Sequence, residues 1–223
     1  MNWNGLSLPL LHHWCGSDGQ MTEELMGLCR ENKIPFYVGN HYSAWGWRPD
    51  GQHDFTVMDH YAYRMLEVDP NAKFTLQIAA DNYHNWELRT WLEAHPSECA
   101  RREDGGTVLK QIHSASNVKV VSHASKPWRE ELRRSLAALA RHLKQSPYGH
   151  RALCIQPISG MGGEWYMWGT FDTGGGTERL DYSQPFQEYF ADFALQKYGT
   201  LDAVNQAWRT DYSSTAEISI PSV

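Results

Sequence analysis

Glu164 is the residue in this sequence whose surroundings best suit acid–base chemistry. It follows an apolar segment, residues 152–158, and a glycine-rich turn, residues 160–163. Three aromatic residues come directly after it: Trp165, Tyr166 and Trp168. Ligands of parallel α/β folds bind at the carboxyl ends of the strands. Desolvation by aromatic neighbours raises the pKa of a carboxyl group toward the value that a general acid needs near neutral pH. A surface glutamate on a loop that adjoins aromatic residues gives the same pattern.

Polar and aromatic residues also follow the other predicted strands. Asp81 comes just after the apolar run 74–78, and His41 and Tyr42 come just after the run 34–38. Asp81 is interpreted as a ligand for a hydroxyl group or, with less support, as a second carboxylate, although turn residues at strand ends are often aspartate. The chain has 10 Trp and 11 Tyr, and aromatic residues in loops indicate binding surfaces. Besides the residues around Glu164, the expected walls of a binding site are His41, Trp45, Trp47 and Trp86. Core packing would explain some of these aromatic residues equally well.

The patterns typical of metal and cofactor sites are missing from the sequence. His12 and His13 are adjacent, but no HExxH motif or third ligand at a fixed spacing accompanies them. Neither the glycine-rich turn at residues 160–163 nor the glycine loop at residues 174–176 is followed by Lys and Ser or Thr, which excludes a phosphate-binding P-loop. The four cysteines form no CxxC pair and are expected to be buried free thiols: Cys15, Cys29, Cys99 and Cys154. We therefore expect no metal and no cofactor.

Charge and hydropathy exclude two classes of partner. The net charge is −6 and the basic residues are scattered, whereas nucleic-acid binding requires a basic face. No apolar run approaches the ~20 residues that span a bilayer. The start of the chain lacks the pattern of a signal peptide, so together with the free thiols a cytoplasmic location is expected.

The apolar periodicity predicts a strand followed by a helix, four times over. The strands are expected at residues 6–11, 34–38, 74–78 and 152–158, and the main helices at 22–31, from about 55, from Pro127, and between Ser183 and Gly199. Shorter elements are expected near Trp91, at residues 118–121 and after Thr200, which is expected to cap the helix that follows it. His12 and His13 are expected to close the first strand. Leu28, Val57 and Phe193 are expected on the inward faces of their helices. Strands that alternate with helices pair in parallel through right-handed crossovers. A doubly wound sheet and a (β/α)₈ barrel both fit, and a complete barrel needs eight units over about 250 residues. We predict a single α/β domain over residues 1–223. Its fold is a partial (β/α)₈ TIM barrel of about four βα units, which is a half barrel.

Several segments then show a family resemblance. They are Trp91–Pro96, Ser125-Lys126-Pro127-Trp128-Arg129, Gly163-Glu164-Trp165-Tyr166, Asp181-Tyr182-Ser183 and the run from Tyr189 to Trp208. These segments resemble glycoside hydrolases of clan A, and most closely family 42, the β-galactosidase type. The resemblance covers most of the chain from about residue 55 onward, and the stretch from Tyr198-Gly199 to Trp208 is its most specific part. It implies that Glu164 is the acid/base residue of a glycosidase that acts on β-linked sugars.

Two departures from the family pattern bear on this interpretation. The family places an asparagine that binds the sugar 2-hydroxyl directly before the acid/base residue, and this chain has Gly163 there. The family's nucleophile is a glutamate at the end of the seventh strand, which this sequence does not reach. A retaining mechanism needs two carboxyl groups about 5–5.5 Å apart, so the nucleophile is expected from missing sequence or from another subunit.

Three hypotheses follow from the sequence. The first is a glycosidase that uses Glu164 on an oligo- or monosaccharide glycoside substrate. The second is a carbohydrate-binding half barrel without catalysis. The third is a structural fragment whose open sheet edges lead it to form a homodimer.

Overall fold

The computed structural model describes residues 2–3, 6–7, 13–15, 19–33, 36–40, 46–48, 50–80, 86–112, 115–158 and 181–221. These residues belong to two compact units. The first unit contains the described residues of 1–80, 84–87 and 132–159, and the second contains those of 81–83, 88–131 and 160–223. Both units are assembled from segments that are separate in the sequence. The prediction of one domain over residues 1–223 stays a prediction.

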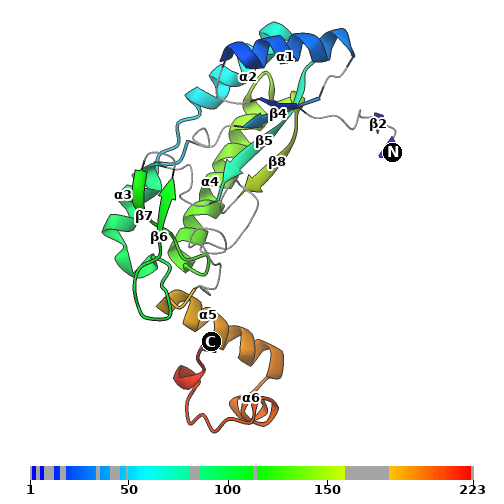
Figure 1. Cartoon of the computed structure of the whole chain (residues 1–223). Coiled ribbons are helices and arrows are strands. Elements are labelled where there is room, and N and C mark those ends of the chain that lie inside the picture. The colour runs from blue at the N-terminus through cyan, green and yellow to red at the C-terminus, as the bar shows by residue number, and fades with distance from the viewer. Residues whose placement is uncertain are drawn as a thin grey trace. The chain divides into compact units, whose positions relative to one another are not determined.

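The first unit is built on a four-stranded parallel sheet. Its strands, in spatial order, are β3 (His13–Cys15), β4 (Phe36–Asn40), β5 (Lys73–Ala79) and β8 (Ala152–Ile158) (Figure 1). All three neighbouring pairs are parallel. A doubly wound sheet reverses its strand order at a switch point, whereas these four strands follow one another in chain order. The chain therefore has an α/β fold in which these four strands are wound in one direction only.

The start of this sheet differs from the predicted strand at residues 6–11. Leu6–Ser7 forms a two-residue strand, β2, which pairs antiparallel with β1 (Asn2–Trp3). The first parallel strand is β3, so His13 opens a strand that it was expected to close. Residues 8–11 of the predicted strand lie outside the described residues. By contrast, β8 has the predicted bounds, and β5 extends the predicted strand by one residue at each end.

Two helices of the first unit have buried residues. They are α1 (Gly19–Glu31) and α2 (Thr56–Val68). Met58, Ala62 and Met65 of α2 are at most 4% exposed, and they are spaced by four and three residues along one face. Val57 lies about 100° around the helix from Met58 and is 48% exposed, so its expected place on the inner face was wrong. Leu28 of α1, also expected inside, is 55% exposed.

The second unit is built around two buried tryptophans and a hairpin. Its elements are most of α3 (Trp86–Ala94), η1 (Pro96–Glu98), β6 (Leu109–Ile112), β7 (Ala115–Lys119), the first turns of α4 (Lys126–Gln145), α5 (Gln184–Tyr198), α6 (Leu201–Trp208) and η4 (Thr215–Glu217). The rings of Trp91 and Trp128 are 5.6 Å apart and both are buried. The sequence predicted a helical stretch near Trp91 and a strand overlapping β7, but not the antiparallel partner β6.

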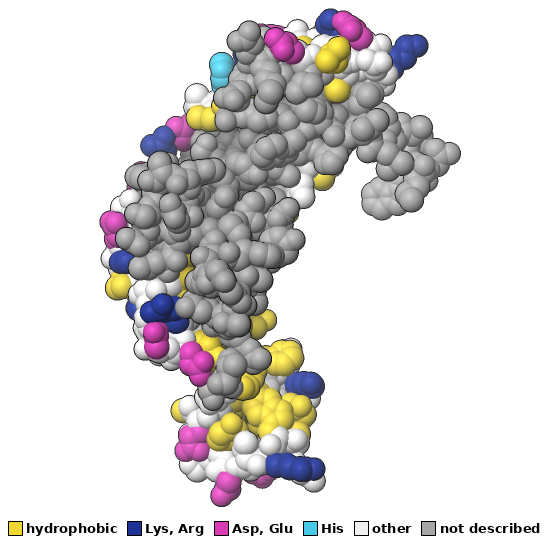
Figure 2. All heavy atoms as spheres, in the orientation of Figure 1, with side chains coloured by type: hydrophobic (Ala, Val, Ile, Leu, Met, Phe, Trp, Pro, Cys, Tyr) yellow, Lys and Arg dark blue, Asp and Glu magenta, His cyan; other side chains and the backbone are white. Residues whose placement is uncertain are grey.

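The helices after the sheet form a small core of their own. Ala194 of α5, Val204 of α6 and Ile218 pack together and are at most 2% exposed. Thr200 caps α6 as predicted, because its hydroxyl accepts a hydrogen bond from the Ala203 N–H at 3.2 Å. Phe193 was expected to face inward and is instead 51% exposed. Figure 2 shows hydrophobic side chains at the surface of the part of the molecule that holds α5 and α6.

The described residues also bear on two further expectations, the burial of the cysteines and the lack of a membrane-spanning segment. Cys99 is buried and Cys29 is half-buried, but Cys154 on β8 is exposed, so the expectation of buried thiols fails there. Cys154 sits on an outer strand of the described sheet, where fewer neighbours cover the side chains. Within the described residues, no helix is long and apolar enough to cross a membrane.

A three-residue network holds α2 against the end of α4 in the first unit. Asp59 Oδ1 lies 2.6 Å from His142 Nε2, and it also accepts a short hydrogen bond from the Tyr148 hydroxyl. The Phe55 ring stacks on the His142 ring with 4.5 Å between ring centroids. Burial, together with the hydrogen bond to Asp59, raises the pKa of the Tyr148 hydroxyl well above its usual range. One carboxylate thus serves two donors from the segment that leads into β8.

Replacing Asp59 with alanine is expected to destabilise the first unit. The change leaves the Tyr148 hydroxyl and His142 without their acceptor, and such a loss costs about 1–3 kcal/mol in the free energy of unfolding. Urea unfolding measures it. Glu67→Ala on the same helix is the control, because Glu67 makes only an exposed ion pair with Arg64, worth at most about 1 kcal/mol. Equal effects of the two changes would contradict the structural role of the network.

Candidate active site

Several predicted site residues come shortly after the carboxyl ends of the parallel strands in the sequence. The four strands end at Cys15, Asn40, Ala79 and Ile158. In the register of the sheet, Ala79 lies beside Ile158 and Asn40 beside Gln77. Because the strands are parallel, all their carboxyl ends point to the same edge. The chain therefore leaves every strand on the side where an α/β enzyme binds its ligand.

Three predicted residues follow these strand ends closely in the sequence. His41 is the next residue after β4, Asp81 comes two positions after β5, and Glu164 comes six positions after β8. Most of the predicted site lies outside the described residues: Glu164, Trp165, Tyr166, Trp168, Asp81, His41 and Trp45. Trp86 begins α3, and its side chain is also outside the description. Their roles stay predictions.

Trp47 is the one predicted site residue whose side chain the structure describes. It is 2% exposed, and its backbone pairs with that of His53 in an antiparallel bridge. The His53 ring lies 3.0 Å from the Ser135 hydroxyl of α4. The segment after β4 therefore folds back toward α4 and buries the indole ring. The Trp47 ring is therefore buried in this arrangement, and its expected role as a wall of a binding site stays a prediction.

Hydrogen bonds close this segment tightly around Trp47. The Asp54 N–H donates to the Gly46 carbonyl at 2.8 Å. The Asp54 carboxylate accepts hydrogen bonds from Thr56 and from the Arg48 guanidinium. These hydrogen bonds, those of Thr56 first, lower the pKa of Asp54 to about 2. The Asp54 side chain is therefore ionised throughout the neutral range, and the turn stays closed.

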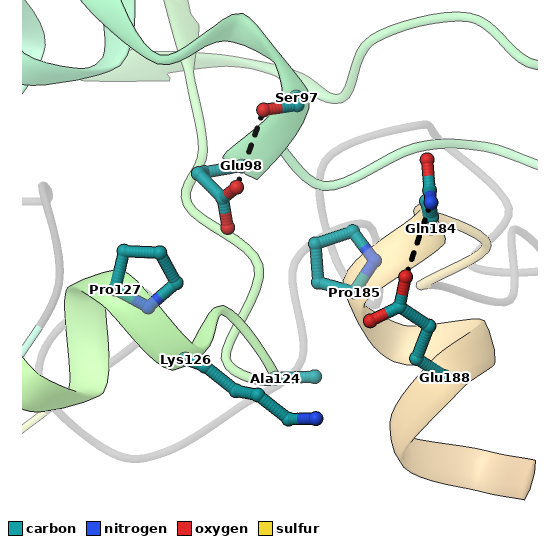
Figure 3. Close-up of a pocket in the computed structure, with 8 residues that line it drawn as sticks. All are labelled: Ser97, Glu98, Ala124, Lys126, Pro127, Gln184, Pro185 and Glu188. Carbon is teal, nitrogen blue, oxygen red and sulfur yellow. Dashed lines mark hydrogen bonds between the residues drawn. The ribbon is translucent and has the colours of Figure 1, made fainter.

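A second feature, which the sequence did not reveal, is a polar hollow in the second unit. A cavity of about 300 Å³ lies between η1 and the first turns of α4 and α5, as Figure 3 shows. Its lining residues are Ser97, Glu98, Ala124, Lys126, Pro127, Gln184, Pro185 and Glu188. They come from three segments that are far apart in the sequence, so no local motif could have indicated the hollow. Among the described residues, no group of three or more His, Cys, Asp or Glu side chains is placed to hold a metal ion.

Comparison with known proteins bears on the fold. No protein-family model matches the sequence, and the search of curated proteins found no match. Among solved structures, the catalytic domain of a β-amylase from Paenibacillus polymyxa is similar with a TM-score of 0.64 and 17% identity, over 96% of this chain and 54% of that chain. A β-galactosidase from the psychrophilic Marinomonas ef1 is similar with a TM-score of 0.62 and 19% identity, over 95% of this chain and 29% of that chain. A cold-adapted β-galactosidase from Rahnella sp. R3 is similar with a TM-score of 0.56 and 18% identity, over 96% of this chain and 29% of that chain.

These likenesses establish the fold and not the activity. The chain has an α/β fold similar to that of the β-amylase domain and the two β-galactosidases. It spans about half of the β-amylase domain and less than a third of each β-galactosidase chain.

Gly46 is expected to be irreplaceable in the turn that buries Trp47. Gly46 and Gly51 both have positive φ angles, +72° and +77°. A Cβ at Gly46 would lie 2.3 Å from the Asp54 carbonyl oxygen. A Cβ at Gly51 would meet nothing within 4 Å. Gly51→Ala should cost about 1–2 kcal/mol from the left-handed backbone alone. Gly46→Ala should cost a further 1–3 kcal/mol or so from steric overlap. Denaturant unfolding of the two variants gives the difference, and equal losses would show that the turn can open without cost.

Proposed function

We propose that this chain is the first four βα units of a (β/α)₈ barrel glycoside hydrolase that acts on β-linked sugars. The observation that carries the proposal is the parallel sheet in chain order, whose carboxyl ends all meet at one edge. The fold shared with the β-amylase domain and the two β-galactosidases supports it. The resemblance of residues 122–213 to family 42 supports the finer assignment to the β-galactosidase type.

Glu164 is the proposed acid/base residue. Its carboxylic acid protonates the glycosidic oxygen while the bond from that oxygen to the anomeric carbon breaks. The nucleophile, a second carboxylate, bonds to the anomeric carbon as the leaving oxygen departs. In the second step the Glu164 carboxylate takes a proton from water, the water oxygen bonds to the anomeric carbon, and the bond between that carbon and the nucleophile breaks. Aromatic neighbours at positions 165, 166 and 168 would keep the carboxyl group protonated near neutral pH by excluding water.

The remaining residues of the proposed site have simpler roles. Asp81 binds a sugar hydroxyl, and His41, Trp45 and Trp86 form walls against which sugar rings stack. The nucleophile is a second carboxylate that this chain does not identify. In the proposed mechanism it comes from further βα units, either in a longer form of the protein or in another subunit.

A non-catalytic sugar-binding half barrel remains the alternative function. It keeps the aromatic walls and Asp81 but places no second carboxylate beside Glu164. The departure at Gly163, where the family has a sugar-binding asparagine, favours this alternative.

Glu164→Gln separates the two functions. If the chain is an enzyme, the variant should lose about 10²–10⁴-fold in kcat for a 4-nitrophenyl β-galactoside, because a general acid contributes about that much. Binding of the sugar should survive, because glutamine keeps the shape of the side chain. The measurement is the release of 4-nitrophenol under saturating substrate.

Glu93→Gln provides the matched control. Glu93 is an exposed glutamate on α3 outside the proposed site, so its replacement should leave kcat unchanged. Absence of turnover by the unmodified chain, alone and mixed with a complementary half barrel, would favour the non-catalytic alternative.

We also propose that the chain forms a homodimer. In the described sheet, β3 and β8 are the outer strands, and each pairs with a single neighbour. Open strand edges promote association, and Leu153 on β8 is 36% exposed. Two copies would supply eight parallel strands, the number in a closed barrel.

Light scattering at micromolar concentration should therefore give twice the mass of the chain. Leu153→Lys should weaken the dimer roughly tenfold or more in its dissociation constant. Leu28→Lys is the control, since Leu28 is a leucine on α1 and not on a strand, and at 55% it is more exposed than Leu153. A monomer for the unmodified chain would refute the proposal.

A further inference from the structure

The polar hollow of the second unit continues into a longer groove along α5. A second cavity, of about 540 Å³, shares Lys126, Gln184 and Glu188 with the first. It runs beside α5 to the segment around η4, where Thr215 and Ser219 line it. We call the two connected cavities the α5 groove. Its size lies within the range of about 300–1,000 Å³ that is typical of ligand sites.

At one end of the α5 groove a carboxylate oxygen lacks a hydrogen-bond partner. Glu98 Oε1 accepts a hydrogen bond from the Ser97 hydroxyl at 3.2 Å, but Oε2 is buried and has no partner. Figure 3 shows the carboxyl group of Glu98 between the rings of Pro127 and Pro185. A buried acceptor without a donor costs free energy. A ligand O–H or N–H group in the groove recovers that cost when the Glu98 side chain turns its Oε2 atom toward the groove.

Donors and acceptors lie next to each other along the groove. The Gln184 side-chain amide donates to Glu188 Oε1 at 3.0 Å, which fixes the orientation of both side chains. The Lys126 ammonium lies 3.5 Å from Asp192 Oδ2 in an exposed ion pair. Exposed ion pairs contribute little to stability, so this pair can rearrange around a ligand. The floor between these polar groups is apolar and is formed by Ala191, Leu195 and Ile218.

This combination of groups selects among ligand classes. Three carboxylates and one ammonium line the groove, which disfavours an anion. An apolar ligand would leave the carboxylates and the ammonium without partners. A neutral molecule with many hydroxyl groups can donate to the carboxylates, accept from Lys126 and lay its C–H faces on the apolar floor and the proline rings.

We infer that the α5 groove is an accessory binding site for a neutral oligosaccharide. The choice of a sugar among polyhydroxyl compounds rests on the proposed function. All residues that line the groove belong to the second unit, and none of them is a residue of the proposed catalytic site. Its role is to hold a sugar chain independently of bond cleavage.

Nuclear magnetic resonance of the full chain tests the inference at one side chain. The Gln184 side-chain amide signals are assigned by their loss in Gln184→Ala, and cellotetraose or β-1,4-galactotetraose is then titrated. At least one of the two sugars should shift the Gln184 signals in a saturable way. Glu188→Ala should raise the dissociation constant read from these signals at least about fivefold, the effect of losing one hydrogen bond.

Two controls make the result specific. Gln196 is an exposed glutamine on the same helix that lines neither cavity, so its amide signals should not move and Gln196→Ala should not change the affinity. Glu164→Gln should leave the Gln184 titration unchanged even where it abolishes turnover, which separates failure of this inference from failure of the proposed function. Unshifted Gln184 signals with both sugars, or a shift with the cation spermidine alone, would overturn the inference.

Discussion

Parallel pairing of four successive strands is the constraint on which the rest of the structure depends. Once β3, β4, β5 and β8 align in the same direction, every connection must cross back along the sheet, and each strand releases the chain at the same edge. The helices α1 and α2 and the long segment before β8 are these return connections. A fold of this kind gathers residues that are distant in the sequence without needing them to contact one another along the chain. That is why a glycosidase function can be proposed from the order of the strands together with the residues that follow them.

Apolar periodicity predicted the sheet well where strands are continuous and apolar, as at Ala152–Ile158 and Lys73–Ala79. At the first predicted strand only Leu6–Ser7 is described, and this segment pairs antiparallel with β1 outside the parallel sheet, a partner that apolar periodicity alone does not reveal. It also placed Phe193 on the wrong side of α5, since a helix with many aromatic residues offers more than one apolar face.

The sequence likewise predicted some features of the candidate site and missed others. Positions after strand ends could be selected from the sequence, because parallel strands define where ligands bind. The burial of Trp47 could not be predicted, since it depends on a hydrogen-bonded turn that closes through Gly46 and Asp54. The α5 groove could not be predicted either, because Glu98, Lys126 and Glu188 lie on three separate segments and no spacing rule connects them.

The chain order of the strands also has a consequence for the way the protein folds during synthesis. Each strand docks on a neighbour that the ribosome has already released, so β3, β4 and β5 can pair while the C-terminal half is still being translated. The step from β5 to β8 is different, because the 72 residues at 80–151 must emerge before Ala152 can meet Phe74. Closing so long a loop carries a larger entropic cost, and we expect this docking to set the pace at which the nascent sheet is completed.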